Sequence, residues 1–140
     1  MEHDNNFWMQ MAIDLAIEGN TPFGAVITDV EGNHVGAFNT TILDGATAHA
    51  EINAIQKVKE LDYDEARELA LYSTVEPCPM CMSAIIWAGI GKVVYGTDIT
   101  FAMTQGNQIT ITAAEVAREA WYDVEIEGGL LKKECEALFG

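Results

Sequence analysis

A pair of cysteines separated by two residues has the clearest chemical meaning in this sequence. Cys78 and Cys81 follow Pro77 and precede an apolar run at 82–88. Two thiolates with this spacing can bind one metal ion from the first turn of a helix, and zinc is the usual metal. The same spacing occurs in thioredoxin-like redox pairs and in zinc ribbons. The pair alone therefore leaves open a redox site, a structural zinc site and a catalytic zinc site.

An upstream His-x-Glu pair, His49 and Glu51, favours the catalytic zinc site. His49 would join the two cysteines as a third protein ligand, and a catalytic zinc keeps its fourth position for water. Glu51 could accept a proton from that water and deliver it to a substrate. Cys135, His3 and His34 lack local ligand spacing, although any of them could still approach in space and close a structural site.

Helices and strands that alternate along the chain are expected to position this motif. The predicted helices cover residues 4–18, 48–60, 79–88, 113–121 and 130–139, and the predicted strands cover 23–28, 35–38, 69–75, 92–96 and 124–126. Loops are expected at 39–47 and 97–112. The first two strands form a hairpin, and strand–helix–strand crossovers follow, which favours a layered α/β fold with parallel strands at its centre.

Composition limits the kind of protein and its partners. The chain has 140 residues, enough for one domain spanning 1–140, with 7 basic and 22 acidic residues and a net charge of −15. Nucleic-acid affinity depends largely on Lys and Arg, so this charge disfavours a nucleic-acid partner, and it suits a salty interior. We expect no membrane span and no secretory signal, and the three cysteines do not suggest disulfides. These features together predict a cytoplasmic protein.

The segments Thr47–Glu51 and Glu76–Cys81 resemble the signature of the cytidine deaminase-like superfamily of zinc hydrolases, and the similarity extends over about residues 7–95. The resemblance implies a three-layer α/β/α sandwich with a central mixed five-stranded sheet. It also implies a Zn²⁺ cofactor held by His49, Cys78 and Cys81, with Glu51 as the catalytic proton carrier. The implied reaction is hydrolytic deamination of a small purine or pyrimidine substrate, commonly by a homodimer.

Within this superfamily, the segments 21–26 and 83–88 look most like bacterial guanine deaminases. This resemblance implies that Asn39 contacts the base and that Phe23 lines the pocket, and we also expect Ala50 to contact substrate. Guanine deaminases read the purine amino group with acidic residues in the C-terminal part, and Asp98 is a candidate for that role. Three of these residues have a simpler alternative role. Asn39 and Asp98 suit turns, and Phe23 suits an ordinary core.

Other readings of the same residues stay open. The segments 90–96 and 126–135 are similar to bacterial tRNA adenosine deaminases, although this chain is short of the basic residues with which those enzymes grip RNA. A cytosine or other small-heterocycle deaminase is a further possibility. A zinc-stabilised binding module is the non-enzyme alternative, but such a module would have no need of Glu51.

Overall fold

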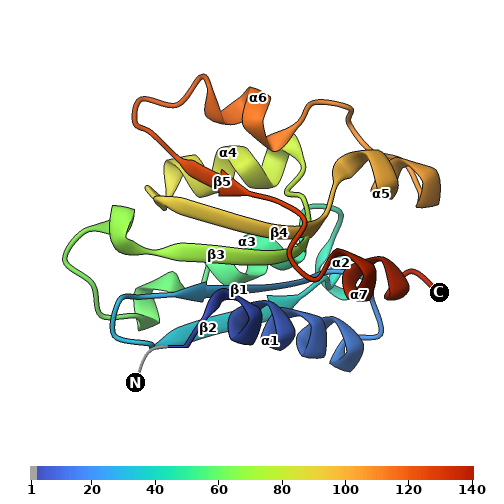
Figure 1. Ribbon diagram of the computed structural model, residues 1–140, viewed down its shortest axis with the longest axis horizontal. Coiled ribbons are helices and arrows are strands. Elements are labelled where there is room, and N and C mark those ends of the chain that lie inside the picture. The colour runs from blue at the N-terminus through green and yellow to red at the C-terminus, as the bar shows by residue number, and fades with distance from the viewer. Residues whose placement is uncertain (1–2) are drawn as a thin grey trace.

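Strand β3 (Ala70–Val75) lies at the centre of a five-stranded sheet in the order β2-β1-β3-β4-β5. The computed structural model describes residues 3–140 (Figure 1). β1 (Gly24–Thr28) pairs antiparallel with both β2 (His34–Phe38) and β3, whereas β4 (Lys92–Thr97) is parallel to both β3 and β5 (Glu125–Glu127). The predicted α/β fold with a mixed five-stranded sheet is confirmed.

Helices cover both faces of this sheet. The helices are α1 (Asn5–Glu18), α2 (Thr41–Asp44), α3 (Ala50–Ile55), α4 (Pro79–Trp87), α5 (Ile99–Gln105), α6 (Ala113–Ala117) and α7 (Lys132–Ala137), with 3-10 turns at Val58–Glu60 and Ala66–Glu68. α1 and α7 pack on one face, while α3, α4 and α6 pack on the other (Figure 1). Within residues 3–140, no helix combines the length and the apolar composition needed to cross a membrane.

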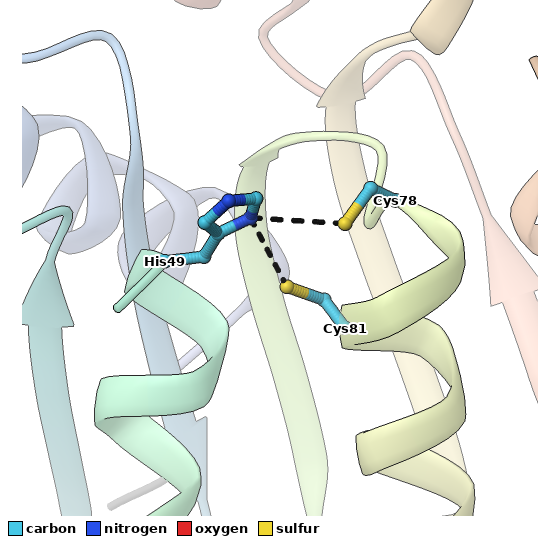
Figure 2. Close-up of side chains that lie close together, drawn as sticks. All are labelled: His49, Cys78 and Cys81. Carbon is cyan, nitrogen blue, oxygen red and sulfur yellow. Dashed lines mark hydrogen bonds between the residues drawn. The ribbon is translucent and has the colours of Figure 1, made fainter. Parts of the chain in front are cut away.

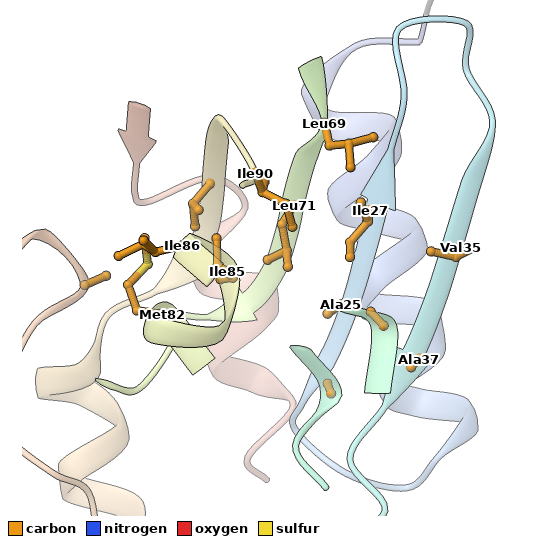
Figure 3. Close-up of a cluster of buried hydrophobic side chains, with 14 of the residues drawn as sticks. Ala25, Ile27, Val35, Ala37, Leu69, Leu71, Met82, Ile85, Ile86 and Ile90 are labelled. Atoms are coloured by element: carbon orange, nitrogen blue, oxygen red, sulfur yellow. The ribbon is translucent and has the colours of Figure 1, made fainter. Parts of the chain in front are cut away.

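Alternating side chains of the central strands build two separate cores. Leu71 of β3 and Val93 of β4 face the core beneath α3 and α4, which Figure 3 shows. Their neighbours Tyr72 and Val94 face the opposite core, beneath α1 and α7. Successive side chains of a strand point to opposite faces of the sheet, so strands that are buried on both faces carry continuous apolar runs. Because both faces of β3 and β4 are packed, the residues that follow their carboxyl ends start from a fixed position.

The structure changes the predicted boundaries in several places. Residues 99–105 of the expected 97–112 loop form helix α5, and a short helix, α2, lies inside the expected 39–47 loop. The α5 helix begins because the Asp98 carboxylate accepts a hydrogen bond from the Phe101 backbone N–H at 2.8 Å. The helix expected over 48–60 ends at Ile55 and gives way to a 3-10 turn. The helices expected at 113–121 and 130–139 are also shorter than predicted.

Candidate functional site

Two helix starts bring the His and Cys side chains of the motif together. His49 is the residue immediately before α3, Cys78 is the residue immediately before α4, and Cys81 lies in the first turn of α4. Figure 2 shows the three side chains pointing toward one another from the two helices. His49 Nδ1 lies 3.7 Å from Cys78 Sγ and 3.5 Å from Cys81 Sγ. Within residues 3–140, these three alone form a candidate metal cluster, with ligand atoms all within 4.8 Å of one another.

The spacing of these atoms fits a tetrahedral zinc site. Zinc lies about 2.3 Å from a thiolate sulfur and about 2.0 Å from an imidazole nitrogen, so a tetrahedral arrangement places the two ligand atoms about 3.5 Å apart. The two observed N–S separations of 3.5 and 3.7 Å are close to that value. Three protein ligands would leave a fourth position for water, which is the arrangement of catalytic rather than structural zinc sites. His3, His34 and Cys135 do not join the cluster.

The two thiols differ in how readily they lose a proton. A hydrogen bond from the Cys81 thiol, with a further contribution from His49, lowers the pKa of Cys78 to about 4. The same hydrogen bond and burial raise the pKa of Cys81 above its usual range. The contact with Cys78 raises the pKa of His49. Binding of a metal ion needs both cysteines as thiolates and a free ring nitrogen on His49, so it would displace protons from the site.

Glu51 lies beside the triad in the first turn of α3 and is buried, with 6% of its surface exposed. Burial raises the pKa of its carboxyl group from 4.5 to about 7. A carboxyl group with a pKa near neutrality can both accept and donate a proton at physiological pH. Together with its position next to the triad, this suits Glu51 to carry a proton between a water molecule and a substrate.

A cavity of about 380 Å³ opens next to the triad. Its lining includes His49, Glu51 and Cys78, and also the predicted substrate-binding residues Phe23 and Asn39. His49, Cys78 and Glu51 therefore face the same cavity as two of the residues expected to hold a substrate.

Asn39 presents a defined polar group to this cavity. Its side-chain oxygen accepts hydrogen bonds from the backbone N–H and the hydroxyl of Thr41, both at 3.0 Å. The carboxamide oxygen is thus used within the protein, and the NH₂ group is the part of Asn39 left to donate to a ligand. Asn39 can therefore stabilise the turn and line the cavity at once, because its bonds to Thr41 orient the side chain.

The structure does not bring the other two predicted substrate contacts into the cavity. The Asp98 carboxylate caps α5, and its second oxygen lies 3.9 Å from Lys132 Nζ. Ala50 is the first residue of α3 and is fully buried, and its side chain is not part of the cavity lining. Asp98, expected to read the substrate, caps α5 in this structure and does not line the cavity.

Several cavity residues have no signal in the local sequence. The segment 105–108, which begins at the last residue of α5, lines one wall, and Glu76 and Phe139 also face the cavity. Phe139 lies edge-to-face with Phe23, with ring centroids 5.8 Å apart, and with Phe101 at 5.4 Å. The 105–108 segment and Phe139 lie far from His49 and Cys78 along the chain, so only the folded chain reveals them. Glu76 is only two residues before Cys78, but its spacing does not indicate a place in the cavity wall.

Comparisons with known proteins agree with this site. The family model for the zinc-binding region of cytidine and deoxycytidylate deaminases matches residues 2–97. A guanine deaminase of Bacillus subtilis is 36% identical over 128 residues, covering 86% of this chain and 80% of that protein. A tRNA-specific adenosine deaminase of Haemophilus influenzae is 31% identical over 134 residues, covering 91% of this chain and 76% of that protein.

A solved structure of a guanine deaminase from Nitrosomonas europaea is similar in fold, with a TM-score of 0.83 and 20% sequence identity. The match covers 99% of this chain and 84% of that chain. Other solved structures with a similar fold hold the purines 8-azaguanine and 2,6-diaminopurine. The proteins that this chain resembles therefore include ones that bind purines.

Proposed function

Because this chain belongs to the cytidine and deoxycytidylate deaminase zinc-binding family of hydrolases, we propose that it deaminates a free nucleobase, with guanine as the first candidate. The reaction would convert guanine and water to xanthine and ammonia. Guanine is the first candidate because the guanine deaminase relative is 36% identical over most of both chains. The absence of Lys and Arg side chains from the cavity favours this proposal over its main alternative, a tRNA adenosine deaminase.

None of the seven Lys and Arg residues in the described part of the chain lines the cavity. The two carboxylates in the lining, Glu51 and Glu76, would instead repel a phosphate group. The net charge of −15 would also repel an RNA backbone, whose binding needs Lys and Arg contacts. The absence of Lys and Arg from the cavity lining is the observation that favours a neutral, unphosphorylated substrate over a tRNA or a nucleotide.

The residues around the cavity can be given roles in such a reaction. A zinc ion held by His49, Cys78 and Cys81 would lower the pKa of a water molecule toward neutrality. Glu51 would take the proton from the attacking water and transfer it to the ring nitrogen and the leaving amine. The Asn39 NH₂ group would donate a hydrogen bond to the base, and Phe23 would contact its ring.

Ammonia release from a substrate panel tests this proposal, with zinc content measured on the same sample. We expect release from guanine, and little or none from guanosine monophosphate or from an RNA hairpin that carries adenosine in a tRNA anticodon loop. Guanine left intact while the hairpin reacts would replace the guanine proposal with the tRNA alternative. Turnover of cytosine alone would identify a pyrimidine enzyme. A zinc-loaded protein that releases no ammonia from any substrate would support the binding-module alternative.

We also propose that the chain forms a homodimer through an exposed aromatic pair. Trp87 at the end of α4 and Trp121 have exposed fractions of 79% and 61%, and their ring centroids are 5.2 Å apart. Exposed aromatic clusters of this kind often lie at protein interfaces. Self-repulsion at a net charge of −15 would oppose association, so salt should strengthen it.

Light scattering after size-exclusion chromatography tests the dimer. We expect a dimer at high salt for the wild type and a monomer for Trp87→Ser. The matched control is Ile42→Ser, which removes another highly exposed apolar side chain (98%) from a different helix, α2. A wild-type monomer at every salt concentration, or equal effects of the two substitutions, would contradict the proposed interface.

A further inference from the structure

One wall of the cavity is made by a segment with little support of its own. Residues 105–108 line the cavity, and the segment 107–111 that continues from them makes no backbone hydrogen bonds within the described residues. Two apolar side chains of this segment, Ile109 and Ile111, are 59% and 45% exposed and so provide little packing. The position of the wall therefore depends on how its two ends are held.

Glu76 holds both ends. One carboxylate oxygen accepts a hydrogen bond from the backbone N–H of Ile99, at the start of α5, at 2.9 Å. The other oxygen accepts from the backbone N–H of Ala113, at the start of α6, at 2.7 Å. Glu76 is itself buried, with 6% of its surface exposed. A carboxylate that accepts two short hydrogen bonds in a buried position makes a strong and directional connection.

Glu76 is also tied to the metal turn, residues 77–81, which carries Cys78 and Cys81. It is two residues before Cys78, and its backbone N–H donates to the Thr97 carbonyl at 2.8 Å, which joins the ends of β3 and β4. A single side chain thus connects the strand that carries the metal turn with both ends of the opposite wall. Any shift of Glu76 would change the distance between the triad and that wall.

The wall carries amide side chains that have no partner in the protein. Gln105 donates to the Thr104 hydroxyl at 3.0 Å, but within residues 3–140 the carboxamides of Asn107 and Gln108 make no hydrogen bond. Gln108 is only partly exposed, although it is polar. A carboxamide offers both a donor and an acceptor without charge. Such groups suit the edge of a neutral base that also carries both.

We propose that Asn107 and Gln108 are specificity-determining residues that bind the edge of the base, and that Glu76 is a positioning residue that holds them opposite the metal turn. The assignment of a base as ligand rests on the proposed function. The substrate class is a neutral heterocycle with a hydrogen-bond donor and an acceptor on one edge. In this proposal, the carboxamides of Asn107 and Gln108 bind the base in the way that the sequence alone suggests for Asp98.

Glu76→Gln tests the positioning role, because glutamine has nearly the same shape but only one acceptor oxygen. In the zinc-loaded protein, we expect hydrogen exchange at the amide of Ile99 or Ala113 to accelerate by about tenfold or more, as one bond is lost. For guanine, KM should rise by about tenfold with a smaller change in kcat, and zinc content should stay the same. Glu119→Gln, at an exposed position, is the matched control and should change none of these.

Gln108→Leu tests the binding role, with Asn107→Leu as the second variant. Loss of one hydrogen bond to the base should raise KM for guanine by about tenfold and leave both zinc content and exchange at Ile99 and Ala113 unchanged. Gln10→Leu is the control, since Gln10 is an exposed glutamine on α1 outside the cavity. Unchanged KM in both wall variants would overturn the binding role.

The exchange measurement also separates this inference from the proposed function. If the wild type released no ammonia from guanine, the proposed function would fail, but exchange at Ile99 and Ala113 would still decide whether Glu76 holds the wall. If Glu76→Gln left exchange at both amides and the KM of an active enzyme unchanged, the positioning role would be wrong even though guanine is a substrate.

Discussion

Replacement of Glu51 by glutamine should lower the rate of ammonia release from guanine by at least about 100-fold, the lower end of the effect of general acid–base catalysis. Glutamine has a similar shape but cannot accept the proton from water or deliver it to the leaving amine. Zinc content should not change, because the candidate metal cluster consists of His49, Cys78 and Cys81 without Glu51. The loss of activity should therefore occur in a protein that still contains its metal.

The variant should also fold normally. Burial raises the pKa of the Glu51 carboxyl group to about 7, which means that the protein environment disfavours its charged form. A neutral amide at the same position avoids that cost, so the free energy of unfolding near neutral pH should not fall. Thermal unfolding measured beside the activity assay checks this expectation.

Glu119→Gln serves as the control for the loss of a carboxylate, because Glu119 is exposed. Its activity and zinc content should equal those of the wild type. Retention of more than a tenth of the wild-type rate by the Glu51→Gln protein would show that another group carries the proton. Loss of zinc along with activity would instead indicate that Glu51 supports the metal site.

Replacement of Cys81 by serine should remove zinc binding and activity together. Cys81 is completely buried and lies 3.5 Å from His49 Nδ1, so a ligand at this position cannot be replaced by solvent without rearrangement. A ligand that binds only the folded state at about 1,000 times its dissociation constant stabilises the protein by about 4 kcal/mol. In a domain of this size, that free energy corresponds to roughly 10 °C in melting temperature.

The measurement is the melting temperature with and without added zinc, together with the metal content of the purified protein. We expect zinc to raise the melting temperature of the wild type and to have little effect on Cys81→Ser. Cys135→Ser is a matched control because Cys135 is equally buried, at 0% exposure, but lies outside the metal cluster. It should lose stability from burial of the hydroxyl and yet keep its full response to zinc.

Two outcomes would contradict a zinc site at this position. An equal zinc response in the wild type and in Cys81→Ser would show that the ion binds elsewhere. Loss of the zinc response in Cys135→Ser as well would show that the assay reports general destabilisation of the core rather than loss of a ligand.

Local patterns predicted some elements well and others poorly. The strands at 69–75 and 92–96 were placed correctly to within a residue or two, because burial on both faces leaves continuous apolar runs in the sequence. The sequence does not indicate helix α5, because its Thr and Gln residues resemble a loop in composition and its start depends partly on a hydrogen bond from Ile99 to the distant Glu76. Its capping residue Asp98 was a local signal that could have identified it.

The sequence by itself determined the metal chemistry and the family, because His49, Glu51, Cys78 and Cys81 act through short spacings at the starts of two helices. Only the tertiary structure decided which residues line the cavity beside the triad. It placed the amides of the 105–108 segment and the ring of Phe139 in the cavity wall. The physical reason is that a helix start orients its side chains locally, whereas the cavity wall is held by contacts between residues far apart in the chain.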